Sequence, residues 1–121
     1  MILVDTSVWV DHLRVADARL VEQLHDGQVL CHAFVIGELA CGNLRRRVEI
    51  LSLLVDLPQL PALPSEEVMQ FIDAHRLMGK GLGWVDMHLL ASAFVSREAL
   101  WTKDRRLADT ANRLGLLGHR G

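Results

Sequence analysis

The regular alternation of short apolar runs with longer, helix-like segments constrains the fold of this chain most strongly. Residues 2–4, 28–32 and 99–102 form runs that are short enough to be buried strands. The segments between them carry apolar residues at helical spacing. Strands that alternate with one or two helices are joined by crossovers and pair in parallel. The sequence therefore predicts an α/β fold in which a parallel sheet is covered by helices.

Glycines and prolines set the expected limits of the helices. Gly27 is expected to end one helix as a left-handed cap, and Ser65 to begin another as its N-cap. The prolines between residues 58 and 64 exclude a long helix there but allow a short edge strand. Residues 116–117 are expected to add a final short strand. The expected helices cover residues 7–13, 16–26, 33–41, 45–57, 65–78 and 84–97, with a last one that begins at Asp104.

The composition fits one compact domain over residues 1–121. Half of the residues are hydrophobic and 23% are charged, which excludes a disordered chain. We expect no secretory signal, no membrane span and a cytoplasmic location, because no apolar run is long enough for either segment. Cys31 and Cys41 both lie in apolar segments, so we expect two reduced core cysteines.

Four separated acidic residues hold the chemical interest of the sequence. Asp5 directly follows the first apolar run, and Asp104 lies two residues after Thr102 at the end of the third. Glu38 and Asp86 lie on expected helices that follow or precede strands. Functional groups of open α/β sheets gather outside the carboxyl ends of the strands. All four side chains are therefore candidates for one crevice.

Each acid also has an ordinary structural interpretation, which the sequence leaves open. Asp5 and Asp104 could be N-caps, and Asp86 could simply complement the dipole of its helix. Glu38 is the only charged residue between 33 and 42, in a helix expected to be buried on most sides. A buried carboxylate needs a cation, a metal ion or a proton, although an exposed outer face remains an alternative for Glu38.

Clustered carboxylates suggest metal-dependent hydrolysis. Like charges raise each other's pKa values unless a cation is present, and Mg²⁺ and Mn²⁺ prefer oxygen ligands. Such ions can activate water for attack on a phosphodiester. The net charge of −2 argues mildly against a nucleic-acid partner, but neutralising four acids would bring it to about +2. Two basic clusters are either solvated helix faces or contacts for RNA phosphates; they contain Arg45, Arg46, Arg47, Lys103, Arg105 and Arg106.

The surroundings of the four acids resemble the motifs of a known family. Residues 2–7, Ile-Leu-Val-Asp-Thr-Ser, look like the opening of a PIN domain. Residues 33–42, 83–93 and 100–107, which contain Glu38, Asp86 and Asp104, resemble the second, third and fourth motifs. The match covers nearly the whole chain in order, and the short form looks like the VapC toxins of type II toxin–antitoxin pairs. The resemblance implies a three-layer PIN-like domain, with a central parallel sheet flanked by helices.

The same resemblance implies an activity and a set of roles. The protein would be a Mg²⁺- or Mn²⁺-dependent endoribonuclease that acts on an RNA substrate, is inhibited by a cognate VapB-like antitoxin and forms a homodimer. Asp5 and Asp86 would be the central metal ligands, and Glu38 would complete the acidic cluster. Asp104 would bind the metal directly or through water, with Asp109 nearby as an alternative fourth acid. Supporting hydrogen bonds to the carboxylates would come from Thr102 and from Thr6 or Ser7.

Two other functions are compatible with parts of the pattern. A phosphatase or phosphoacceptor domain would use Asp5 as its nucleophile. Haloacid-dehalogenase-like phosphatases, however, have a second acid two residues later, where this chain has Ser7. A non-catalytic module that only binds an antitoxin would have no need for four intact acids. We therefore expect the nuclease.

Overall fold

The computed structural model of the chain describes residues 1–119 and contains a parallel sheet at its centre. Its three strands are β1 (Ile2–Val4), β2 (Val29–Leu30) and β3 (Ala99–Trp101). They are ordered β2-β1-β3, and β1 pairs in parallel with both neighbours. The register places Ile2 opposite Val29 on one side and opposite Ala99 on the other. The predicted parallel α/β sheet is therefore confirmed.

Single bridges extend the sheet at both edges. Cys31 pairs in parallel with Gln59, and Leu100 pairs in parallel with Leu117. The Leu60 N–H donates to the Cys31 carbonyl at 2.8 Å, and the Gly118 N–H donates to the Leu100 carbonyl at 2.8 Å. The edge pieces predicted near the prolines and at residues 116–117 are thus present, each as one bridge and not as a full strand.

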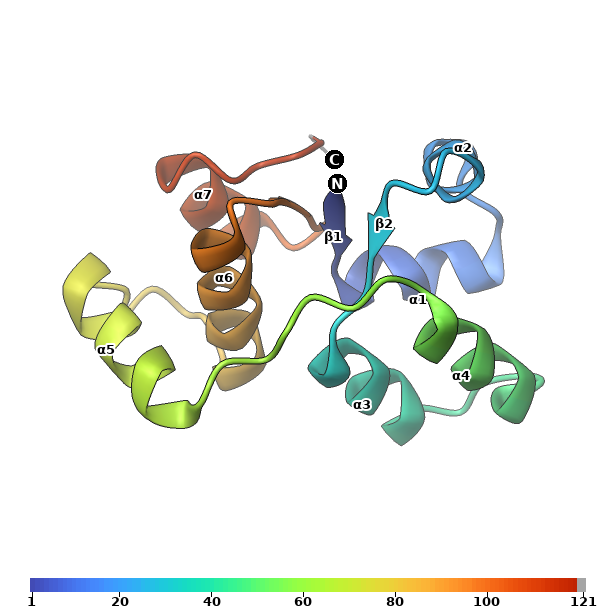
Figure 1. The fold of residues 1–121 in the computed structure, drawn as a ribbon, viewed down its shortest axis with the longest axis horizontal. Coiled ribbons are helices and arrows are strands. Elements are labelled where there is room, and N and C mark those ends of the chain that lie inside the picture. The colour runs from blue at the N-terminus through green and yellow to red at the C-terminus, as the bar shows by residue number, and fades with distance from the viewer. Residues whose placement is uncertain (120–121) are drawn as a thin grey trace.

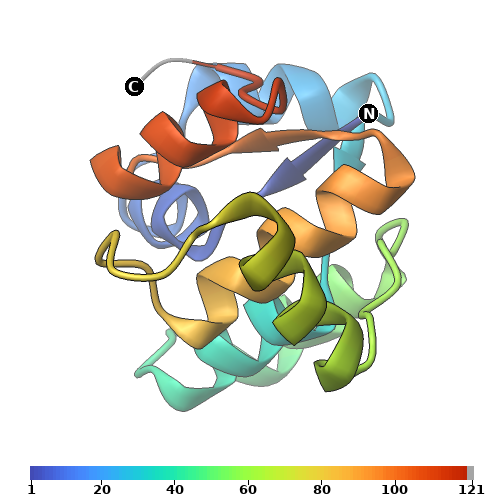
Figure 2. The same ribbon diagram turned by 90° about the vertical axis from the view of Figure 1, so that its left-hand side faces the viewer.

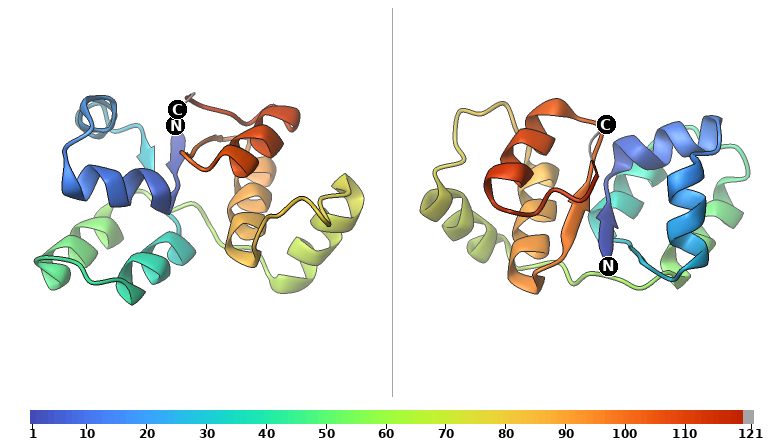
Figure 3. Two further views of the ribbon diagram at one scale, coloured as in Figure 1. Left: turned by 180° about the vertical axis from the view of Figure 1, so that it is seen from behind. Right: turned by 90° about the horizontal axis from the view of Figure 1, so that it is seen from above.

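Helices cover both faces of the sheet and make the predicted three layers (Figures 1 and 3). One layer consists of α1 (Thr6–Arg14), α2 (Ala18–His25), α3 (Ala33–Cys41) and α4 (Arg47–Asp56). The other layer consists of α5 (Ser65–His75), α6 (Trp84–Ser96) and α7 (Arg105–Arg113). Figure 2 shows α5 and α6 in front of the sheet, with α1 and α2 behind it. The chain runs from β1 through β2 to one edge of the sheet and then crosses to β3 and the other edge, so right-handed crossovers put α1–α4 on one face and α5–α7 on the other.

The helix ends follow local residue chemistry, but two predictions for α5 were wrong. Gly27 adopts the left-handed conformation after α2, with a φ of 66°. Ser65 is already the first residue of α5, and Pro64 takes the N-cap position. The same helix ends at His75, three residues earlier than predicted, because Arg76 turns left-handed with a φ of 53°. Proline suits a helix start because it has no N–H to satisfy and its φ is already fixed.

The core lies on both sides of the sheet, which explains the uninterrupted apolar sequences of the strands. Leu3, Val4 and Leu100 are fully buried, together with Leu89 and Leu90 of α6. Within residues 1–119, no helix is both long and apolar enough to cross a membrane.

The two cysteines differ in their surroundings. Both are free thiols; Cys31 is buried at the end of β2, and burial raises its pKa. Cys41 is exposed, so the prediction of a second core cysteine was wrong. It is the last residue of α3, which buries only Val35 and Leu39.

Candidate active site at the carboxyl ends of the strands

Asp5 directly follows β1 and is 5% exposed. It occupies the N-cap position of α1 with extended backbone, but its side chain accepts no hydrogen bond from that helix. Its Oδ2 atom instead accepts the hydroxyl of Ser7 at 2.7 Å and the hydroxyl of Thr102 at 2.7 Å. The capping interpretation of Asp5 was therefore wrong, and the carboxylate is held by hydroxyls at the carboxyl end of the sheet.

Those two hydroxyls tie the start of α1 to the turn between β3 and α7. The Ser7 and Thr102 oxygens lie 3.3 Å apart although 95 residues separate them. The Lys103 N–H donates to Ser7 Oγ, and the Asp104 N–H donates to Thr102 Oγ1, both at 3.0 Å. The neighbouring ends of β1 and β3 thus share one hydrogen-bonded network.

Asp104 is the N-cap of α7. Its Oδ1 atom accepts the Leu107 N–H at 3.1 Å, so the capping interpretation holds for this acid. The bond occupies one carboxylate oxygen and leaves Oδ2 available to another partner. Asp109, the alternative fourth acid, lies in the middle of α7 and is exposed.

Glu38 is exposed, and the expectation that it would be buried was wrong. The helix α3 packs through Val35 and Leu39, so the other apolar side chains do not enclose Glu38. The Thr6 hydroxyl donates to Glu38 Oε1 at 2.6 Å. This contact joins α3 to the first residue of α1, next to Asp5.

Asp86 lies in the first turn of α6 and is half-buried. Its Oδ2 atom accepts the Gly83 N–H at 3.0 Å, the short-range contact expected of an acid at this place. Burial raises the pKa of Asp86, and the charges of Asp5, Asp104 and Glu38 raise it further against the opposing Gly83 hydrogen bond. The four acids selected from sequence therefore share one electrostatic environment centred on Asp86.

The four carboxylates have the same hydrogen-bonding state. Within residues 1–119, each uses one oxygen for protein donors and leaves the other without a hydrogen bond. No three His, Cys, Asp or Glu side chains of the described chain already converge on a point where they could hold a metal ion. The arrangement supplies available carboxylate oxygens around one region, but it is wider than a finished coordination shell.

Several of the predicted phosphate contacts are occupied by protein partners. Lys103 Nζ lies 3.1 Å from Asp11 Oδ2 and 3.7 Å from Asp17 Oδ2. Burial acts to raise the pKa of Asp17, but the N–H groups of Leu20 and Arg19 and the Lys103 ammonium lower it overall. Sequence reasoning missed both acids as partners of Lys103, because no periodic pattern relates residue 103 to the α1–α2 connection.

The arginines divide into two groups. Arg46 pairs with Glu49 at 2.6 Å, and Arg47 donates to the Ala40 carbonyl at 3.0 Å. In the part of the chain that the structure describes, Arg45, Arg105 and Arg106 have no ion pair or hydrogen bond from their side chains. The second group remains available for an external anion.

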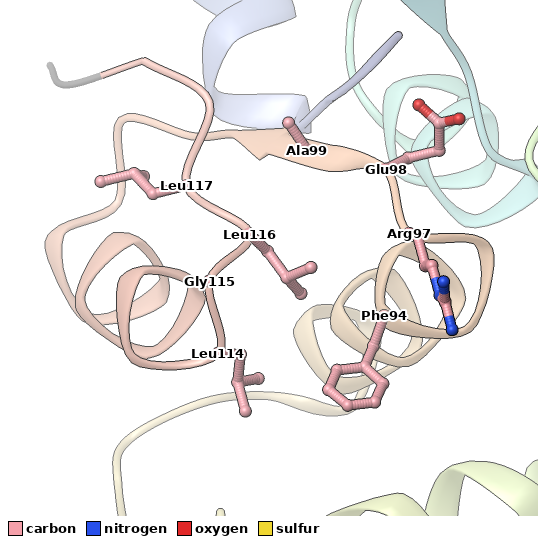
Figure 4. Close-up of a pocket in the computed structure, with 8 residues that line it drawn as sticks. All are labelled: Phe94, Arg97, Glu98, Ala99, Leu114, Gly115, Leu116 and Leu117. Carbon is pink, nitrogen blue, oxygen red and sulfur yellow. The ribbon is translucent and has the colours of Figure 1, made fainter.

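A groove of about 980 Å³ adjoins the acids and includes Thr6 and Glu38 in its wall. Its cationic wall residues are Arg14, Arg45 and Arg46, and its apolar ones are Val10, Leu13, Leu39, Leu44 and Ile50. A second cavity of about 530 Å³ lies at the opposite end of β3, between Phe94 and residues 114–117 (Figure 4). Its acid, Glu98, is paired with the chain's amino terminus at 2.9 Å. The second cavity is therefore separate from the acidic site.

The PIN domain family model matches residues 2–113. Ribonuclease VapC32 of Mycobacterium tuberculosis, from strains CDC 1551 / Oshkosh and ATCC 25618 / H37Rv, is 53% identical over 108 residues, covering 88% of this chain and 87% of the relative. The crystal structure of PAE2754 from Pyrobaculum aerophilum superposes with a TM-score of 0.59 at 18% identity, covering 94% of this chain and 88% of that one. This chain therefore belongs to the PIN-domain family and, within it, to the VapC ribonuclease toxins.

Proposed function

We propose that this chain is a metal-dependent endoribonuclease whose active site consists of Asp5, Glu38, Asp86 and Asp104. The observation that carries the proposal is that each of the four carboxylates keeps one oxygen without a hydrogen bond among the described residues, and burial and the other three acids also raise the pKa of Asp86. Grouped carboxylates that repel one another are costly unless they serve a cation. The similarity of this chain to a named ribonuclease indicates the reaction, RNA cleavage, and the four acids indicate where on the protein it occurs.

The donor set suits Mg²⁺ or Mn²⁺. Both ions prefer carboxylate oxygens and usually keep several waters, so they do not require a complete protein shell. Asp5 and Asp86 are the proposed central ligands, with Glu38 and Asp104 at the periphery, directly or through water. The ion would supply Lewis-acid activation of water and charge stabilisation at the scissile phosphate.

The surrounding donors position these carboxylates. Ser7 and Thr102 both donate to Oδ2 of Asp5, which fixes the carboxylate and would leave its Oδ1 atom free to hold the ion. The Thr6 hydroxyl likewise donates to Oε1 of Glu38, and the Gly83 N–H donates to Oδ2 of Asp86, so each of these carboxylates is also held through one oxygen. Hydrogen-bonded partners of this kind typically affect metal affinity or activity by about 10- to 100-fold.

RNA would approach across the acidic site, with its backbone contacted by arginines whose side chains have no hydrogen bond or ion pair within residues 1–119. Arg45 lies in the groove that also contains Glu38, and Arg105 and Arg106 follow Asp104 directly. We do not assign phosphate binding to Lys103, because Asp11 and Asp17 already balance its charge. Binding through the arginines would weaken with added salt, since it releases counterions from the RNA.

The decisive experiment is cleavage of end-labelled RNA by the purified protein. We expect cleavage with Mg²⁺ or Mn²⁺, none in EDTA, and recovery when the metal is restored. Asp86→Asn should be inactive, whereas Asp109→Asn should retain activity as the matched control. Full activity in EDTA would contradict the metal-dependent mechanism, and cleavage by Asp86→Asn would contradict the site assignment.

The partner part of the proposal is a VapB-like antitoxin, with a homodimer as the assembly. The groove beside Glu38 supports a peptide partner, because apolar side chains line it and arginines flank it. Co-expression with the protein encoded next to this chain, followed by light scattering, tests both points. A complex that forms without suppressing cleavage would contradict the inhibitory role. If a complex forms and the free protein never cleaves RNA, the non-catalytic binding module becomes the better function.

A further inference from the structure

One tryptophan is exposed next to the acidic site. Trp9 is 4% exposed and Trp101 is 1% exposed, as expected for large apolar side chains in a core. Trp84 is 42% exposed. It is the first residue of α6 and follows Gly83, whose N–H holds the Asp86 carboxylate. An indole left in water at this position has no role in the hydrophobic core.

Aromatic contacts hold the Trp84 ring in place. Trp84 and His88 are one helical turn apart, and their rings meet edge to face with centroids 4.6 Å apart and planes at 90°. The His88 ring lies against Phe34 of α3, with centroids 4.1 Å apart and planes at 33°. His88 is only 2% exposed, and neither ring nitrogen has a hydrogen-bond partner within the described residues. The imidazole therefore acts here through its ring contacts, as a support between Phe34 and Trp84.

This aromatic row connects the two sides of the acidic site. Phe34 lies one helical turn before Glu38 on α3, and Trp84 lies two residues before Asp86 on α6. An edge-to-face contact covers at most one face of the indole, so an exposure of 42% leaves ring surface open to another planar group. The two rings that support Trp84 come from separate helices, His88 from α6 and Phe34 from α3.

The guanidinium of Arg106 lies beside the chain segment that precedes Trp84. Gly81 has a φ of 77°, and a Cβ atom added to it would lie 2.6 Å from a guanidinium nitrogen of Arg106. The Arg106 side chain therefore runs directly over the Gly81 backbone, three residues before Trp84. Arg106 also lies two residues after Asp104 at the start of α7, so its side chain joins the helix of that acid to the segment before Trp84. An open aromatic ring face beside a guanidinium is better suited to bind a nucleotide than to bind an apolar surface of another protein.

We propose that Trp84 is a base-stacking subsite that binds one unpaired nucleobase of single-stranded RNA, next to the phosphate cleaved at the acids. The inference rests on the proposed ribonuclease function and adds to it a determinant of substrate choice. Single-stranded RNA is commonly bound by stacking its splayed bases on aromatic rings, with arginines on the neighbouring phosphates. In this arrangement Arg106 contacts the phosphate that flanks the stacked base. Stretches of duplex cannot supply an unstacked base and are bound poorly.

The test measures RNA binding apart from cleavage. The parent is the Asp86→Asn protein in EDTA, titrated against a fluorescein-labelled, unstructured RNA and followed by anisotropy. Trp84→Leu keeps an apolar side chain but removes the ring, and we expect its Kd to rise roughly tenfold. Trp84→Phe should stay within about threefold of the parent. Val95→Ala is the matched control, because Val95 is 61% exposed at the far end of the same helix.

Abasic substitution of the RNA identifies the stacking contact itself. Removing the base at one position should weaken binding to the parent, yet should cause no further loss with Trp84→Leu, because the two changes remove one interaction. Parent-like binding by Trp84→Leu, or additive losses at every abasic position, would overturn the inference. If either of these results is obtained while the wild-type protein cleaves RNA, the proposed function stands and only the stacking subsite fails. If the parent binds no RNA and the wild type cleaves none, both fail.

Discussion

The hydroxyl of Thr102 donates a hydrogen bond of 2.7 Å to Oδ2 of Asp5, and this contact joins the carboxyl ends of two neighbouring strands. Thr102 is 1% exposed and Asp5 is 5% exposed, so the bond lies beneath the surface of the site. Hydrogen bonds to charged groups are stronger than neutral ones, and a buried carboxylate that loses a donor pays a desolvation penalty. The contact therefore serves both the fold and the proposed chemistry.

Thr102→Val tests that contact with little change of shape. We expect cleavage at limiting Mn²⁺ to fall by about 10- to 100-fold, with partial recovery at high Mn²⁺, because Asp5 is held less well. Stability should fall by roughly 1–3 kcal/mol. Thr110→Val is the control, since Thr110 is 3% exposed on α7 and outside the network. Equal effects of the two substitutions on the Mn²⁺ dependence would argue against the positioning role.

Asp86→Asn should abolish cleavage while leaving the metal-free protein as stable as the wild type, or more stable. The pKa of Asp86 is raised in the folded protein, so ionising this carboxyl opposes folding, and the cost appears as pH rises through that pKa. The amide keeps an acceptor for the Gly83 N–H. Urea unfolding in EDTA should show a larger advantage for the variant at pH 7 than at pH 4. A large loss of stability at pH 7 would mean that Asp86 is chiefly a structural residue.

The parallel sheet and the positions of the four acids could be predicted because they depend on local patterns. The runs at 2–4 and 99–101 have no polar residue, and strands buried on both faces need none. Asp5 directly follows the first of these strands and Asp104 lies three residues after the second, so the parallel topology places both at the carboxyl edge of the sheet. Their order along the chain was enough to predict a common site.

The remaining errors concern tertiary packing, which periodicity does not contain. Glu38 was expected to be buried because its neighbours are apolar, yet α3 has only one face in the core and Glu38 lies outside it. Capping was the alternative interpretation of Asp5, but the hydroxyls of residues 2 and 97 positions away in sequence both bond to its side chain. The ion pairs of Lys103 depend equally on where the α1–α2 connection lies.

His32 should make stability fall in mild acid. It is fully buried, its Nδ1 atom accepts the Phe34 N–H, and its Nε2 atom contacts Ser92 Oγ at 3.0 Å. Burial, and then the nearby His88, lower the pKa of His32 to about 4. The folded-state pKa lies below the unfolded value of about 6.5, so its stabilising contribution is full above pH 6.5 and is lost as pH falls toward 4.

The variant that checks this is His32→Asn, because asparagine can still cap α3. Between pH 7 and pH 4, the free energy of unfolding should fall by about 3 kcal/mol less for this variant than for the wild type. His25→Asn, at an exposed position, is the matched control. Parallel profiles for wild type and His32→Asn would contradict the prediction.

Asp104 can be tested for capping and for metal binding separately. Its Oδ1 atom caps α7, whereas Oδ2 has no partner in the described chain, so the two functions use different atoms. Asp104→Asn keeps a good cap and removes the charge. We expect this variant to unfold like the wild type and to need about tenfold more Mn²⁺ for the same cleavage rate. Asp104→Ala should add a stability loss of about 1 kcal/mol to that same change in Mn²⁺ dependence.

The comparison of the two variants decides between the roles. If Asp104 is only a cap, Asp104→Asn will be silent in both assays and Asp104→Ala will affect stability alone. If it also serves the metal, the two variants will share one Mn²⁺ dependence and differ in unfolding free energy. Isothermal titration with Mn²⁺ gives the affinity without RNA, and urea unfolding in EDTA gives the cap contribution without metal. If Asp104→Asn and Asp104→Ala differ in cleavage rate but not in Mn²⁺ affinity, Asp104 would instead be a contact for the RNA.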